Sequence, residues 1–108
     1  MVRRPQAVLR RQFDVHWLRS PHEGLVVILQ HDLADQLDTR VVAPLTDVPH
    51  RLVVDGLRLK VDFGSGDYLL QIDRLAALSR SAIGPYAGRL EHEQDRIKAG
   101  LDLLFLGF

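Results

Sequence analysis

Apolar and polar residues alternate along several short stretches of the chain, which is the two-residue period of a β-strand with one buried face. The clearest stretch is residues 57–63, where four apolar residues are separated by Arg58, Lys60 and Asp62. A similar alternation covers residues 12–18, and shorter apolar runs occupy residues 25–29, 41–45, 52–54 and 68–72. Turn-forming residues stand at 20–24 and 64–67. This pattern predicts several antiparallel strands joined by tight turns.

The period changes near the C-terminus. Five apolar residues recur there at steps of seven, four, three and four, with charged residues between them: Leu90, Ile97, Leu101, Leu104 and Phe108. This spacing predicts an amphipathic helix over residues 89–104. We expect Gly84-Pro85 to break the chain before the helix and Gly107 to end it. The elements predict either an α+β fold or a small barrel, and periodicity alone does not choose between them.

Composition and charge narrow the class of protein. The chain has 108 residues, of which 46% are hydrophobic and 26% charged, as expected for one folded domain. Fourteen basic residues balance fourteen acidic ones, so no overall charge favours nucleic acid or an anionic membrane. There are no cysteines and no apolar stretch of membrane-spanning length. We therefore expect a soluble cytoplasmic protein without direct nucleic-acid or membrane binding.

Residues 1–11 differ from the rest of the chain. They are basic, contain Pro5 and show neither strand nor helix periodicity. We expect a disordered N-terminal extension over residues 1–11, followed by one domain over residues 12–108.

Catalytic and metal-binding chemistry is only weakly indicated. The histidines, which we interpret as surface residues, lack the three- or four-residue spacing of a helical metal site: His16, His22, His31, His50 and His92. No serine stands in a Gly-x-Ser-x-Gly motif. Glu93 and Asp95 follow His92 in the first turns of the predicted helix, where exposed acids are ordinary. We therefore expect no metal, no cofactor and no enzymatic activity.

The last six residues form an apolar run, residues 103–108, with no polar tail. Such a run is unfavourable in water, so it must be buried either in the core of its own chain or against another chain. The periodicity does not separate these alternatives.

The same C-terminal residues resemble the CcdB family of toxins. The resemblance begins with His92, Ile97-Lys98, Leu103, Phe105 and Gly107 and extends upstream without large gaps. The upstream positions are Ala76, Ser81, Ile83-Gly84, Leu90, Val61, Gly64, Val42, Pro44-Leu45, Gln30, Asp32, Asp35 and Gln12-Phe13-Val15. No single position is specific to the family, but an ordered series of matches over residues 12–108 is hard to obtain by chance.

This resemblance implies a fold and partners. It implies an SH3-like barrel with an antiparallel sheet and a long C-terminal helix, assembled as a homodimer, with Leu104 at the dimer interface. It also implies a toxin that binds the A subunit of DNA gyrase and traps the enzyme on cleaved DNA, performing no chemistry itself. The gyrase contacts carry over to Leu33, Ala34, Asp102, Phe105, Leu106, Gly107 and Phe108. A cognate CcdA-like antitoxin is the second implied partner, with its contact assigned to Ser20, Pro21, His22, Glu23 and Gly24.

The chain departs from the family at its end. Well-known members have a tryptophan before the glycine and a smaller aliphatic residue after it, whereas this chain has Leu106 and Phe108. This departure leaves open a CcdB-like protein that binds antitoxin but no longer poisons gyrase. A second alternative is an endoribonuclease that uses His16 or His92, because small toxins related in fold to the CcdB family include endoribonucleases.

Overall fold

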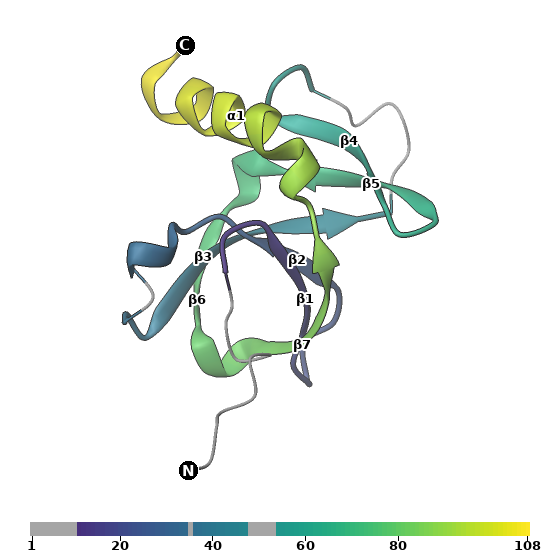
Figure 1. The fold of residues 1–108 in the computed structure, drawn as a ribbon, viewed down its shortest axis with the longest axis vertical. Helices are drawn as coiled ribbons and strands as arrows, with labels where there is room; N and C mark the ends of the chain where they lie inside the picture. Colours follow the sequence, from purple (N-terminus) through teal and green to yellow (C-terminus); the bar gives the residue numbers. More distant parts are fainter. Residues whose placement is uncertain (1–10, 35, 48–53) are drawn as a thin grey trace.

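An antiparallel sheet of seven strands, followed by one helix, forms the body of the molecule (Figure 1). The computed structural model describes residues 11–34, 36–47 and 54–108. The strands are β1 (Asp14–Leu18), β2 (Leu25–Ile28), β3 (Thr39–Thr46), β4 (Arg58–Phe63), β5 (Gly66–Gln71), β6 (Ala76–Ser79) and β7 (Ile83–Arg89). The helix is α1 (Gln94–Leu106), and short 3-10 turns include η2 (Asp32–Ala34), η4 (Ile72–Arg74), η5 (Arg80–Ala82) and η6 (Glu91–Glu93). The predicted α+β class, antiparallel sheet and C-terminal helix are confirmed.

The strand order is β4-β5-β3-β2-β1-β7, with β6 beside β3. Strand β3 changes partner along its length, because residues 39–42 pair with β6 and residues 45–46 pair with β5. In the described part of the chain β4 and β7 do not pair with each other. Within the described residues the sheet is therefore strongly curved but not closed into a barrel.

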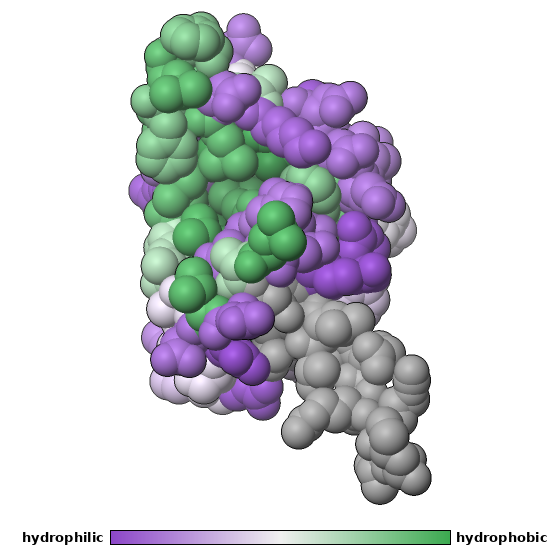
Figure 2. All heavy atoms as spheres, turned by 60° about the vertical axis from the view of Figure 1, so that its left-hand side comes forward, coloured by the Kyte–Doolittle hydropathy of each residue, from purple (hydrophilic) through white to green (hydrophobic). Residues whose placement is uncertain are grey.

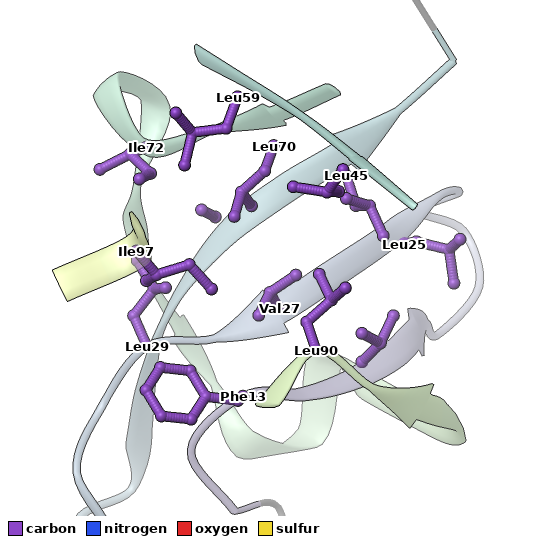
Figure 3. Close-up of a cluster of buried hydrophobic side chains, with 13 residues drawn as sticks. Phe13, Leu25, Val27, Leu29, Leu45, Leu59, Leu70, Ile72, Leu90 and Ile97 are labelled. Carbon is purple, nitrogen blue, oxygen red and sulfur yellow. The ribbon is translucent and has the colours of Figure 1, made fainter. Parts of the chain in front are cut away.

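The main core lies on the concave face of the sheet, under α1. Figure 3 shows side chains from the sheet and the helix pointing toward one another in this cluster. Its fully buried members include Val15, Val27, Leu70, Leu90 and Ile97. Phe13 joins them with a φ of 71°, an uncommon backbone conformation for a bulky residue. Burial of this face is the main stabilising contribution to the fold.

The opposite face of the sheet carries a second, smaller cluster. Val26, Ile28, Val42 and Ile83 are buried there, so several strands are apolar on both faces. His16 is also buried on this side, 1% exposed, and its Nδ1 donates to the carbonyl oxygen of Gly84 at 2.9 Å. The interpretation of His16 as a surface histidine is therefore wrong.

Two strands were not expected from the sequence. We predicted a break at Gly84-Pro85, but both residues lie inside β7. This strand ends the sheet and pairs only with β1, so the missing N–H group of Pro85 is tolerated on an edge. Strand β6 has mostly exposed residues and therefore lacks the alternation that reveals a strand. Of the predicted strand 52–54, residues 52 and 53 lie outside the described residues, and Val54 forms an isolated bridge with Arg58.

The helix begins later and ends later than residues 89–104. Arg89 belongs to β7, where it forms an ion pair with Asp14 of β1. Turn η6 then leads into α1, which runs from Gln94 to Leu106. Ile97 is fully buried against the sheet and anchors the first half of the helix.

Turn η4 packs against α1, and a bidentate ion pair between Arg58 and Asp73 holds the turn in place. Arg58 Nη2 lies 2.8 Å from Asp73 Oδ2, and Arg58 Nε lies 3.1 Å from both carboxylate oxygens. The hydrogen bonds from Arg58 lower the pKa of Asp73 from its ordinary value. The ionised pair therefore contributes to stability at neutral pH.

Replacing Ile97 by Ala is expected to lower the free energy of unfolding by about 3 kcal/mol, because a fully buried branched side chain leaves a cavity. Urea unfolding at one fixed chain concentration measures the loss. Asp95→Ala, an exposed change on the same helix, is the control and should cost less than about 1 kcal/mol. Equal losses in both variants would contradict the assignment of Ile97 as the anchor.

Replacing Asp73 by Asn is expected to cost about 1 kcal/mol at neutral pH, since the charge-assisted bonds to Arg58 are lost. Because the pKa of Asp73 is lowered by folding, its contribution is complete above the unfolded value of about 4 and disappears as the pH falls through the folded value. The stability difference from wild type should therefore shrink in acid. Thermal unfolding across pH, with exposed Asp38→Asn as control, measures it, and a pH-independent difference would speak against the ion pair.

Candidate functional site

The last turns of α1 project apolar side chains into solvent. Leu103 is 37% exposed, Phe105 67%, Leu106 62% and Phe108 85%. In Figure 2 apolar residues gather at the top of the molecule, where α1 ends. We call these four residues the exposed helix end. In the isolated chain this apolar surface is uncovered, so a second molecule could pack against it.

Gly107 determines how the helix terminates. It has a φ of 81° and a ψ of 7°, the left-handed conformation common after the last helical turn, and its N–H donates to the carbonyl oxygen of Leu103 at 3.1 Å. A Cβ atom at Gly107 would meet no other atom within 4 Å. Backbone conformation, and not lack of space within the chain, therefore favours glycine there.

Two other predicted residues on α1 face different surroundings. Asp102 is exposed, and its contact with a partner stays a prediction. Leu104 is partly buried and packs against the main core of its own chain. Its assignment to a dimer interface stays a prediction.

Leu33 and Ala34 lie on η2, apart from α1 in sequence. Leu33 is 90% exposed, whereas Ala34 is half-buried and its carbonyl oxygen accepts from Gln30 Nε2. Among the described residues no hydrogen bond or ion pair joins η2 to α1. Leu37, 55% exposed just after η2, was missed, although a leucine in a polar segment was a visible signal. Leu33 and Leu37 are therefore two exposed leucines, one on η2 and one just after it.

The loop predicted to contact an antitoxin connects β1 to β2. All five of its residues are exposed: Ser20, Pro21, His22, Glu23 and Gly24. The loop lies at the end of β1 opposite to the ion pair between Asp14 and Arg89. Trp17, in the alternating stretch of residues 12–18, is half-exposed beside this loop.

A shallow depression of about 470 Å³ lies between β4, β7 and η6. His92, Asp62 and Arg89 contribute to its lining together with Phe63, Gly64, Ala87 and Gly88. A hydrogen bond with Asp67 raises the pKa of Asp62, and electrostatic repulsion between the two carboxylates acts in the same direction. Arg89 is already paired with Asp14. The depression therefore has a histidine, a carboxyl group and a guanidinium group in its lining, a combination that sequence spacing did not reveal.

Neither a metal-binding cluster nor a membrane-spanning helix occurs among the described residues. Within residues 11–34, 36–47 and 54–108, no three His, Cys, Asp or Glu side chains converge as a metal site would require. His50 lies outside the described residues, as do residues 1–10 of the extension predicted over residues 1–11. The described helix is too short and too polar to cross a membrane.

Comparisons with known proteins agree with the fold. Two solved structures from mycobacterial species resemble this chain: an endoribonuclease in complex with its cognate antitoxin, and an endoribonuclease. The first has a TM-score of 0.75 at 13% identity and covers 91% of this chain and 95% of its own. The second has a TM-score of 0.73 at 14% identity and covers 91% of each. At these identities the likeness establishes the fold alone.

The family comparison is more direct. No curated protein matched the sequence. The family model described as CcdB protein matches residues 12–107, which include the sheet, the helix and most of the exposed helix end. Because this match covers nearly the whole chain, the chain belongs to the CcdB family of toxins from toxin–antitoxin pairs.

Proposed function

We propose that this protein is a toxin that binds the A subunit of DNA gyrase through the exposed helix end and traps gyrase on cleaved DNA. Family membership supports the class of protein. The observation that carries the proposal is the exposure of Phe105, Leu106 and Phe108 at the end of a helix whose first half is firmly anchored. In this proposal the protein acts in the cytoplasm by binding alone and catalyses no reaction.

The chemistry of the helix end suits an interface. Burying a fully exposed Phe or Leu side chain contributes roughly 1.5–3 kcal/mol, so a few such residues in a partner's pocket supply much of a binding energy. The tryptophan of well-known family members is replaced by Leu106, but Phe108 supplies an aromatic ring two residues later. The aromatic anchor is therefore shifted toward the end of the chain in this proposal.

A homodimer would make the interaction symmetrical. Two copies related by a twofold axis present two equivalent helix ends, which matches a partner that is itself dimeric. Leu104 is the residue assigned to the dimer interface, and its partial exposure leaves one side of the leucine for a second chain.

A cognate antitoxin completes the proposed system. One of the solved structures with this fold is described as an endoribonuclease in complex with its cognate antitoxin, so the fold is compatible with such a partner. The exposed loop of residues 20–24 is the proposed contact on this chain. A protein that binds antitoxin without poisoning gyrase is the alternative outcome.

Deleting Leu106, Gly107 and Phe108 is expected to abolish the accumulation of cleaved gyrase–DNA complex and to relieve growth arrest, because most of the exposed apolar surface is removed. Phe105→Ala should reduce potency by about tenfold or more. Gyrase supercoiling and cleavage assays with purified protein measure both effects.

The matched control is Trp17→Ala, which removes an exposed aromatic side chain from the other end of the sheet and should leave gyrase poisoning unchanged. Full activity of the truncated protein would refute the assigned surface. A folded wild-type protein that binds antitoxin but leaves gyrase unaffected would favour the antitoxin-binding alternative.

RNA cleavage is a second candidate function, favoured by the depression that holds His92 beside Asp62 and Arg89. A histidine and a carboxyl group with a raised pKa are suitable partners for general acid–base catalysis. His16, the other histidine considered for this role, is buried and out of reach of a polynucleotide.

If RNA cleavage is the function, purified protein should cut single-stranded RNA, and His92→Ala should slow the reaction by about a hundredfold or more. The control is His31→Ala, which changes an exposed histidine directly before η2. Gel analysis of a defined RNA measures the rate. Intact RNA after incubation with wild-type protein would exclude this second function.

A further inference from the structure

A close contact between two glycines determines where α1 lies on the body of the protein. Gly100 is buried on the inner side of the helix, and Gly56 lies in the turn before β4. An ideal Cβ atom on Gly100 would lie 2.6 Å from the carbonyl oxygen of Gly56 and 2.5 Å from Cδ1 of Ile72. The helix can therefore approach this turn so closely only without a side chain at position 100.

The contact is reciprocal. A Cβ atom on Gly56 would lie 2.7 Å from Cδ2 of Leu103, and Gly56 also has a φ of 82° that other residues rarely adopt. Leu103 is one of the four residues of the exposed helix end. The turn thus touches the helix at Gly100 and again one turn later at Leu103.

We propose that Gly56 and Gly100 are positioning residues, which set the direction of the exposed helix end and thereby the strength with which it binds its target. This inference rests on the proposed function of that surface. It concerns residues that contact no partner themselves and act through the placement of α1.

Helix geometry gives the size of the effect. Ile97 is pinned in the core, and Gly100 lies about 4.5 Å further along the helix axis at a rise of 1.5 Å per residue. Leu106 lies about 13.5 Å from Ile97 on the same scale. Relieving a 2.6 Å contact to an ordinary 3.4 Å requires a shift of about 0.8 Å at position 100, which becomes about 2.4 Å at Leu106. A displacement of this size moves the side chains of the exposed helix end out of register with a complementary pocket on the target.

Helix propensity predicts that a variant with weaker binding can still have a stable helix. Ala is a better helix former than Gly, so Gly100→Ala stabilises the isolated helix while displacing it. Loss of binding together with an intact fold is therefore the signature of a positioning role, whereas a purely structural role changes binding and stability in proportion.

The first test measures the position of the helix end directly. The chain has no cysteine, so Asp55→Cys beside the turn and Leu106→Cys at the helix end give two unique sites for nitroxide labels. Pulsed electron paramagnetic resonance, with labelled protein diluted by unlabelled protein, then gives the distance within one chain. Adding Gly100→Ala should lengthen this distance by about 2 Å, as the helix geometry requires. An unchanged distance would overturn the inference.

The second test measures binding in unlabelled protein. Gly100→Ala should weaken gyrase binding by about tenfold or more, while antitoxin affinity stays the same because the loop of residues 20–24 does not move. The matched control is Ala99→Gly, an exposed change on the same helix turn that lowers helix propensity but alters no packing. It should lower the melting temperature yet keep gyrase affinity.

The two tests separate the two proposals. A lengthened distance with unchanged gyrase affinity would overturn the positioning role. So would a loss of gyrase affinity in both Gly100→Ala and Ala99→Gly that is proportional to the drop in melting temperature. A wild-type protein inert toward gyrase would refute the proposed target, while the distance measurement would still decide whether the glycine contact orients the helix end.

Discussion

The burial of Ile97 against the concave face of the sheet is the interaction on which the rest of the structure depends. It fixes the first half of α1, so the second half extends beyond the sheet with its apolar side chains uncovered. In the proposed function, this intramolecular packing holds the exposed end of α1 in place for binding to a partner.

The sequence was most informative where one face of an element is buried and the other is exposed to solvent. Strand β4 alternates clearly because Leu59 and Val61 point inward while Lys60 and Asp62 are exposed, and it was predicted closely. The helix was recognised for the same reason through Ile97 and Leu104. The family was confirmed by its match over residues 12–107, although the most characteristic position of the helix end, Leu106, departs from it.

The prediction failed where tertiary structure overrides local pattern. Nothing local shows that Gly84-Pro85 lies on an edge that tolerates proline, or that His16 is covered by a second apolar cluster. Phe108 shares the predicted apolar stripe with Ile97 and Leu104 but is 85% exposed, because α1 already ends at Leu106. The depression beside His92 combines three separate elements, which no spacing in the sequence reveals.

The edges of the sheet carry a further consequence. Arg96 of α1 donates to the carbonyl oxygen of Lys60 on β4, and β7 at the other end contains Pro85 and two register shifts. A neighbouring molecule that tried to add its own strand would have to displace an arginine from one edge or forgo a regular ladder at the other. Strand-by-strand addition of further molecules is thereby disfavoured at both edges of the sheet.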